Sequence, residues 1–111
     1  GNTPKVSQLT IDPYKLDLSF AQFTTIGYVL DRQVLVTVNL ISPKNATITL
    51  ISNQLQSAGA QEIIWNAIDI ADTTGKKFVT SEEGLYTVRI QAVNPATATS
   101  YTAKGCLFVA F

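Results

Sequence analysis

Residues 34–41 read Val-Leu-Val-Thr-Val-Asn-Leu-Ile, and residues 85–93 read Leu-Tyr-Thr-Val-Arg-Ile-Gln-Ala-Val. In the first stretch every even-numbered residue is aliphatic, whereas the odd-numbered residues include Thr37 and Asn39. In the second stretch the apolar set runs from Tyr86 to Ala92, again on even numbers. Because successive side chains of a strand point to opposite faces, both stretches predict β-strands with one face in a core.

Further short stretches with β-forming or alternating residues surround these two strands. They are separated by turn-forming sequences such as Asp12-Pro13, Ser42-Pro43-Lys44-Asn45 and Asn94-Pro95. No window predicts a helix. The candidate strands cover Val6 to Ile11, Thr47 to Ile51, Glu62 to Asn66, a short Lys77 to Val79 and Tyr101 to Phe111. Leu16 to Phe20 and Thr24 to Leu30 form either a strand pair or one bent strand. This spacing predicts an all-β, antiparallel sandwich of seven or eight strands.

The length of 111 residues fits one domain, residues 1–111, with a single hydrophobic core. The chain is 46% hydrophobic and only 14% charged, so it can bury such a core. Methionine is missing even from position 1, and we interpret Gly1 as a residue left by cloning or as a processed end. We therefore expect the chain to be part of a larger protein.

The charge balance argues against two classes of partner. Eight basic and eight acidic residues give a net charge of zero, so we expect no nucleic-acid binding. No apolar stretch approaches the length of a membrane-spanning helix, and we expect no membrane insertion. The single cysteine, Cys106, lies in the apolar run Cys106-Leu107-Phe108-Val109, which favours a small buried side chain over a reactive thiol.

A set of motifs between Thr24 and Val93 resembles an immunoglobulin-like sandwich. The motifs are a small-residue turn, a Trp-Asn pair, an Asp, a turn glycine and a Gly-x-Tyr sequence that opens a strong strand. This order is similar to that of the immunoglobulin-like domain of the flagellar hook-capping protein, which also occurs at the ends of bacterial secreted and surface proteins. Ala67 stands where that family usually has glycine. The matching residues are Ser57-Ala58-Gly59, Trp65, Asn66, Asp69, Gly75, Gly84 and Tyr86.

The resemblance implies an immunoglobulin-like or fibronectin III-like fold, in which these residues have structural roles. Trp65 is expected to fill the gap between two sheets, with its N–H bonded to a loop carbonyl. Gly84 is expected to form a tight turn. Tyr86 is expected to pack inward with its hydroxyl bonded to the backbone, as in a tyrosine corner.

The residues needed for catalysis are largely missing. Without histidine the chain lacks histidine-based nucleophilic triads and histidine metal sites. The acidic pairs Asp69 with Asp72 and Glu82 with Glu83 fall in turn-like segments, where solvated carboxylates are expected. Asp69 and Asp72 are also a weak calcium candidate, against the alternative of an ordinary Asx turn. We expect no enzyme activity and no cofactor.

Two function classes remain open. In the first, the chain is a non-catalytic structural or protein-interaction module of a bacterial secreted or surface protein, acting as a spacer, anchor or assembly domain. Its partners would be other domains of the parent chain or other surface proteins. In the second, it is a carbohydrate-binding accessory module whose exposed aromatic rings stack on a polysaccharide. The candidate rings are those of Tyr14, Phe23, Tyr28 and Tyr101.

Assembly through free strand edges is a further question. The Val6 to Ile11 strand and the end of the chain near Phe111 are the expected exposed edges. Lys5, Pro13, Pro95 and Lys104 are placed to discourage edge pairing, and we expect a monomer.

Overall fold

The computed structural model describes residues 3–17, 23–65 and 83–110, and the regular secondary structure in these ranges is β-strand. The prediction of an all-β chain is therefore confirmed for this part of the protein. The predicted strand at Lys77 to Val79 lies outside the described residues. The strands are β1 (Val6–Asp12), β2 (Lys15–Asp17), β3 (Thr24–Leu30), β4 (Val34–Ile41), β5 (Thr47–Gln56), β6 (Gly59–Trp65), β7 (Gly84–Val93) and β8 (Ser100–Ala110).

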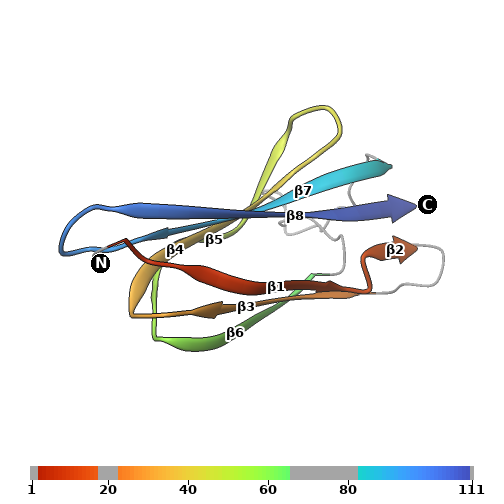
Figure 1. The fold of residues 1–111 in the computed structure, drawn as a ribbon. Helices are drawn as coiled ribbons and strands as arrows, with labels where there is room; N and C mark the ends of the chain where they lie inside the picture. The colour runs from red at the N-terminus through yellow and green to blue at the C-terminus, as the bar shows by residue number, and fades with distance from the viewer. Residues whose placement is uncertain (1–2, 18–22, 66–82, 111) are drawn as a thin grey trace, which may run out of the picture.

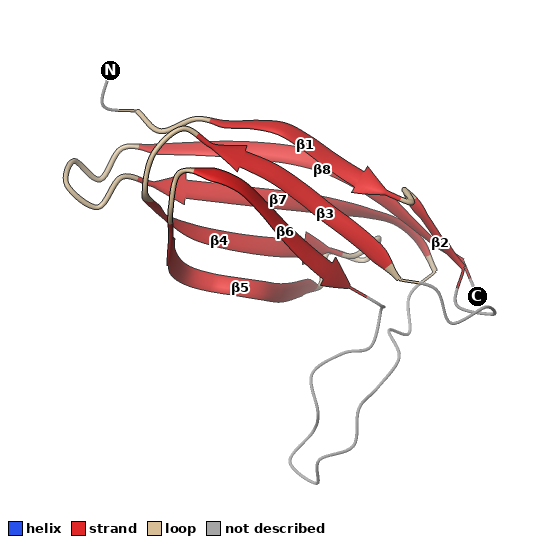
Figure 2. Ribbon diagram, turned by 90° about the horizontal axis from the view of Figure 1, so that it is seen from below, coloured by secondary structure: helices blue, strands red, loops and turns tan. Residues whose placement is uncertain are grey.

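The strands form two sheets that face each other (Figures 1 and 2). The smaller sheet has the order β1-β3-β6, and the larger sheet has the order β2-β8-β7-β4-β5. Neighbouring strands are antiparallel, except that the short β2 runs parallel to β8. The arrangement is a sandwich-like all-β fold with a shared core between the sheets.

The centre of the core comes from β4 and β7, which are adjacent in the larger sheet. The inward residues of β4 run from Val34 to Leu40 and those of β7 from Tyr86 to Ala92, and all of these are fully buried. Their outward neighbours remain partly or fully exposed. The prediction that the even-numbered side chains of β4 and β7 face the core is thus confirmed. Successive side chains of a strand point to opposite faces, so only one of the two sets can be buried.

The smaller sheet supplies the opposite side of the core. In β3 the buried residues are Thr24, Ile26, Tyr28 and Leu30, and in β6 the buried residue is Trp65. The hydroxyl of Thr24 donates a hydrogen bond to the carbonyl of Pro13 at 2.6 Å, so this buried polar group is satisfied.

The β4–β5 hairpin closes through the predicted turn at Ser42 to Asn45. The Asn45 amide donates to the Ser42 carbonyl at 2.9 Å, and the Ala46 amide donates to the Ser42 hydroxyl at 2.9 Å. β5 continues to Gln56, five residues beyond the predicted end at Ile51. A bulge makes this possible: Asn53 has a positive φ of 49°, and its amide donates to the Thr37 hydroxyl at 3.0 Å.

The edge prediction is right for β1 and wrong for the end of β8. β1 is an outer strand of the smaller sheet, as predicted. In contrast, Phe108 to Ala110 pair with Lys15 to Asp17 of β2, and the Phe108 amide donates to the Tyr14 carbonyl at 2.8 Å. The sequence pattern could not show this pairing because it joins segments more than 90 residues apart. Phe111 itself lies outside the described residues.

A hydrogen bond across the core links the two sheets. The hydroxyl of Tyr28 in β3 donates to Oε1 of Gln56 in β5 at 2.6 Å. We expect Tyr28→Phe to lower the free energy of unfolding by about 1 kcal/mol, because it removes this bond and leaves the amide oxygen without its donor. Urea denaturation at neutral pH measures this loss. Tyr101→Phe, at a more exposed ring, is the matched control, and an equal loss in both variants would contradict the role of the bond.

The same hydroxyl predicts a pH dependence. Burial raises the pKa of Tyr28 above its ordinary value of 10.0. The contribution of this group to stability is therefore fully present below that value and is lost as the pH rises through the folded-state pKa. Tyr28→Phe should flatten the alkaline decline in stability, which the same denaturation series at higher pH would show.

Candidate functional site

The four aromatic residues predicted to stack on sugars do not lie on one surface. Tyr14, Phe23 and Tyr101 are exposed by 73%, 54% and 37%, whereas Tyr28 is 1% exposed. An exposed stacking ring at Tyr28 is therefore a wrong prediction. Tyr28 alternates with Ile26 and Leu30 on the inward face of β3, so its ring packs in the core and only its hydroxyl finds a polar partner.

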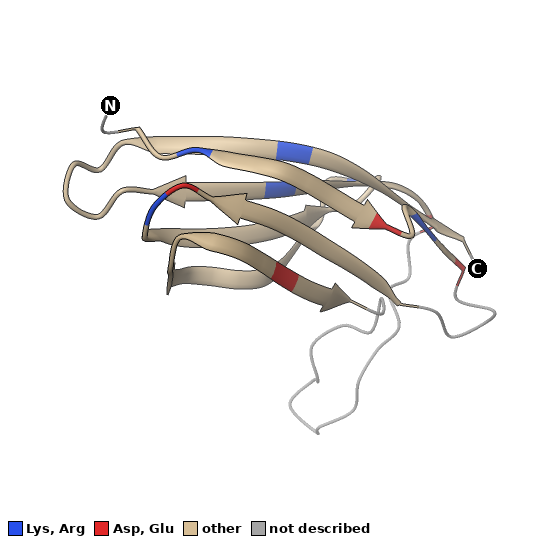
Figure 3. Ribbon diagram, turned by 60° about the horizontal axis from the view of Figure 1, so that its bottom comes forward, with Lys and Arg blue, Asp and Glu red and all other residues tan. Residues whose placement is uncertain are grey.

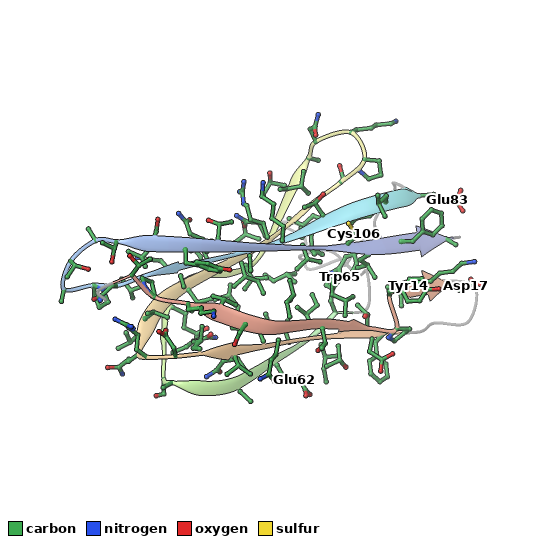
Figure 4. All side chains as sticks on the ribbon, in the orientation of Figure 1. Tyr14, Asp17, Glu62, Trp65, Glu83 and Cys106 are labelled. Atoms are coloured by element: carbon green, nitrogen blue, oxygen red, sulfur yellow. The ribbon has the colours of Figure 1, made fainter. Side chains whose placement is uncertain are left out.

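Among the exposed rings, Tyr14 and Phe23 lie at one end of the molecule and Tyr101 lies far from them. Tyr14 lies where β8 ends, next to Phe108, as its backbone hydrogen bond and Figure 4 show. Phe23 lies at the same end, because its neighbour Thr24 bonds to Pro13. Tyr101 stands near the start of β8, seven residues from Phe108 and thus about 23 Å away along the strand. The four predicted rings therefore do not form one stacking platform, although Tyr14, Phe23 and the exposed Phe108 lie at the same end of the molecule.

Two of the residues that carry the immunoglobulin-like resemblance meet in the core. Trp65 of β6 and Tyr86 of β7 belong to different sheets, and their ring centroids are 6.0 Å apart at an interplanar angle of 51°. Trp65 is 5% exposed and Tyr86 is fully buried. This burial confirms the packing expected of both rings, and Trp65 can be followed between the sheets in Figure 4. The hydrogen bonds expected of their polar atoms stay predictions.

Of the other residues that carry the immunoglobulin-like resemblance, some lie in the described ranges and some lie outside them. Gly84, the first residue of β7, has a φ of +135°, a conformation that favours glycine, and the turn expected of it includes residues outside the described ranges. Asn66, Asp69 and Gly75 lie outside the described residues. The calcium candidate of Asp69 with Asp72 and the carboxylate Glu82 lie outside them as well, so these expectations stay predictions.

The ion pair between Asp31 and Arg32, in the turn between β3 and β4, has a structural role. The Asp31 carboxylate contacts the Arg32 guanidinium at 3.0 Å and accepts a hydrogen bond from the Lys5 amide at 2.9 Å. The Lys5 amide, followed by Arg32, holds the pKa of Asp31 below its ordinary value. These contacts fasten the start of β1 to the turn. They give Asp31 no feature of a catalytic acid.

Cys106 is exposed, which corrects the prediction of a buried thiol. Along β8 up to Val109, the buried or partly buried residues are Ala103, Gly105, Leu107 and Val109, all at odd-numbered positions. Cys106 is at an even-numbered position, so its side chain points to the outer face of the larger sheet. There it pairs with Thr87 of β7. A run of consecutive apolar residues conceals this parity, because every second side chain of the run faces solvent.

We expect Cys106 in the folded protein to react with a maleimide at a rate within about an order of magnitude of that in the unfolded chain. Mass spectrometry over time, with and without guanidinium chloride, measures both rates. Labelling that occurs only after unfolding would contradict the exposed position.

The outer face of the larger sheet carries a polar feature that sequence reasoning missed. Lys104 of β8 stands opposite Arg89 of β7, Arg89 stands opposite Asn39 of β4, and Asn39 stands opposite Thr49 of β5. We call these four residues the cationic row. Figure 3 shows the two basic positions side by side on β7 and β8.

The surroundings of the cationic row contain little to balance its charge. The strands β4, β5, β7 and β8 contain Arg89 and Lys104 but no Asp or Glu. Among the described residues neither base takes part in an ion pair. Within the same ranges, Asn39 Oδ1 is buried without a hydrogen-bond partner. The alternation in the sequence indicates that each residue of the cationic row faces outward. It does not show that the four residues are aligned across four strands.

Comparisons with known proteins give no family assignment. The sequence matches no protein-family description, and it has no significant match among curated proteins. In residues 3–17, 23–65 and 83–110 the structure contains no helix of the length and apolar character needed to cross a membrane.

Proposed function

We propose that this chain is a non-catalytic, immunoglobulin-like module that acts as a spacer, anchoring or assembly domain in a larger bacterial secreted or surface protein. The observation that carries the proposal is the path of the first and last strands. β1 and β8 run side by side in the same direction, because Tyr14, just after β1, bonds to Phe108 near the end of β8. The chain therefore enters at one end of the molecule and leaves at the other (Figure 1).

This path suits a domain that holds its neighbours apart or transmits force between them. The molecule extends 45 × 30 × 22 Å, so it is about twice as long as it is thick. Modules with termini at opposite ends can follow one another along a chain without folding it back. A domain inserted as a binding or catalytic appendage has no need of such a path.

The strand order supports the immunoglobulin-like assignment. Immunoglobulin-like sandwiches place the first, second and fifth major strands in one sheet and the third, sixth and seventh in the other. The orders β1-β3-β6 and β8-β7-β4 correspond to this division when β2 is taken as a side branch of β1 and β5 as an added strand beside β4. Together with the motif around Trp65 and Tyr86, this order supports a relationship to the surface-protein domains that the sequence resembles.

The carbohydrate-stacking alternative loses support from the same geometry. Its four candidate rings divide into one buried ring, two exposed rings at one end of the molecule and one exposed ring, Tyr101, far from those two. The proposal requires no cofactor and no catalytic residue.

A fusion of two copies joined directly end to end tests the spacer role. We expect small-angle X-ray scattering to show a maximum dimension longer than that of one copy by roughly the 45 Å length of the molecule. A matched fusion with a long Gly/Ser linker should give a broader distance distribution, because that linker is a flexible coil. If the direct fusion is compact, with its two copies side by side, the spacer proposal is wrong.

A further inference from the structure

We propose that the outer face of the larger sheet binds an acidic, carboxylate-bearing polysaccharide at the cationic row of Lys104, Arg89, Asn39 and Thr49. This binding site goes beyond the spacer function and does not depend on it. The argument starts from the two bases, continues with the buried acceptor beside them, and ends with the shape of the face.

The two bases stand directly opposite each other across the β7–β8 pair. Like charges in this position repel, and neighbouring acids usually offset the repulsion. Here β4, β5, β7 and β8 hold no acidic residue, and the one acid of the sheet, Asp17 of β2, pairs with Ala110, six residues along β8 from Lys104. A bound carboxylate placed between Arg89 and Lys104 would convert the repulsion into two charge-assisted hydrogen bonds.

Asn39 adds a second requirement, which concerns a hydrogen-bond donor rather than a charge. Its Oδ1 atom is buried and lacks a partner among the described residues, although Asn39 stands next to Arg89 in the row. A buried acceptor of this kind is rare, and a ligand hydroxyl or N–H group can pair with it once the Asn39 side chain turns toward solvent. A sugar acid carries both a carboxylate and several hydroxyls within one ring, so it meets both requirements together.

The rest of the face favours a glycan over an acidic protein segment. Of the four residues that flank the row on β4 and β7, three are polar and both donate and accept hydrogen bonds, Thr37, Thr87 and Gln91, and the fourth is Ile41. These residues lie on β4 and β7, which are interior strands with paired backbone groups, whereas β5, which carries Thr49 at the end of the row, is an outer strand of the sheet. An extended polymer with many hydroxyls can bond to the three polar side chains, and the exposed apolar residues of the same strands, Leu55, Leu85 and Phe108, lie at least four residues from the row.

The test is a titration of the isotopically labelled protein, followed by NMR, with three polymers. Polygalacturonic acid supplies sugar carboxylates, its methyl ester supplies the same sugars without charge, and poly-glutamate supplies carboxylates on a peptide. We expect polygalacturonic acid to shift the amide signals of Asn39, Arg89 and Lys104 and to bind more weakly as salt increases. The methyl ester should leave these signals unchanged.

Single variants identify the groups responsible. Arg89→Gln and Lys104→Gln should each weaken binding of polygalacturonic acid by roughly tenfold, which is the usual effect of losing one charge-assisted hydrogen bond. Lys5→Gln is the matched control, because Lys5 is exposed before β1 of the other sheet and should bind as the unmodified chain does. Thermal unfolding of each variant shows whether the fold is retained.

Three results would overturn the proposal. The first is the absence of shifts at the cationic row with polygalacturonic acid. The second is equal binding of the neutral ester, or unchanged affinity in both folded Gln variants. The third is binding of poly-glutamate at the row with equal or higher affinity, which would assign the face to an acidic protein partner instead.

Discussion

Trp65→Ala is expected to lower the free energy of unfolding by about 3–5 kcal/mol, the usual cost of truncating a large aromatic residue in a core. Trp65 belongs to the smaller sheet and contacts Tyr86 of the larger sheet with ring centroids 6.0 Å apart. The substitution leaves a cavity between the sheets and removes the ring contact. Chemical denaturation followed by circular dichroism measures the loss without relying on tryptophan fluorescence.

The neighbouring residue provides the control for this prediction. Ile64 belongs to the same strand but faces outward and is 64% exposed, so Ile64→Ala should cost less than about 1 kcal/mol. If both variants lose similar stability, Trp65 does not hold the two sheets together in the way that the structure indicates.

The second large effect is expected at Gly84, where β7 begins. Its φ of +135° is a conformation that residues with a side chain rarely adopt, and an added Cβ would lie 3.0 Å from Cγ of Pro43. Gly84→Ala should therefore cost about 1–3 kcal/mol through backbone strain, with a further steric contribution from the proline ring. Denaturation curves for the variant and the unmodified chain measure the sum.

Two comparison variants separate the strain from the steric contact. Gly59 has a φ of +115° but open space around the position of its missing Cβ, so Gly59→Ala reports backbone strain alone. In the double variant Gly84→Ala with Pro43→Ala, removal of the proline ring should restore part of the loss caused by Gly84→Ala. Identical costs for Gly59→Ala and Gly84→Ala, together with strict additivity in the double variant, would show that the contact with Pro43 has no energetic role.

Local sequence patterns predicted the strands correctly where apolar and polar residues alternate. The inward residues of β4 and β7 followed from that alternation alone, and so did the turn at Ser42 to Asn45. The same rule, applied to β3, would have placed Tyr28 beside Ile26 and Leu30 in the core. Choosing Tyr28 as a surface ring ignored its parity, and treating residues 106–109 as one buried run made the same error for Cys106.

The candidate site was less accessible to sequence reasoning than the fold. Arg89 and Lys104 are fifteen residues apart in the sequence, and nothing local shows that they face each other. Their alignment with Asn39 and Thr49 depends on the pairing of four strands. Likewise, the separation of Tyr14 from Tyr101 follows from the length and direction of β8.

The sequence by itself determined that this chain forms strands, which faces of the central strands enter the core, and that histidine-dependent chemistry is excluded. Tertiary structure alone decided the strand order, the parallel pairing of β2 with β8, the opposite positions of the chain ends, and the cationic row. The physical reason is that side-chain alternation is a property of a few consecutive residues. Strand register, in contrast, is set by packing and hydrogen bonds between segments that are distant in the chain.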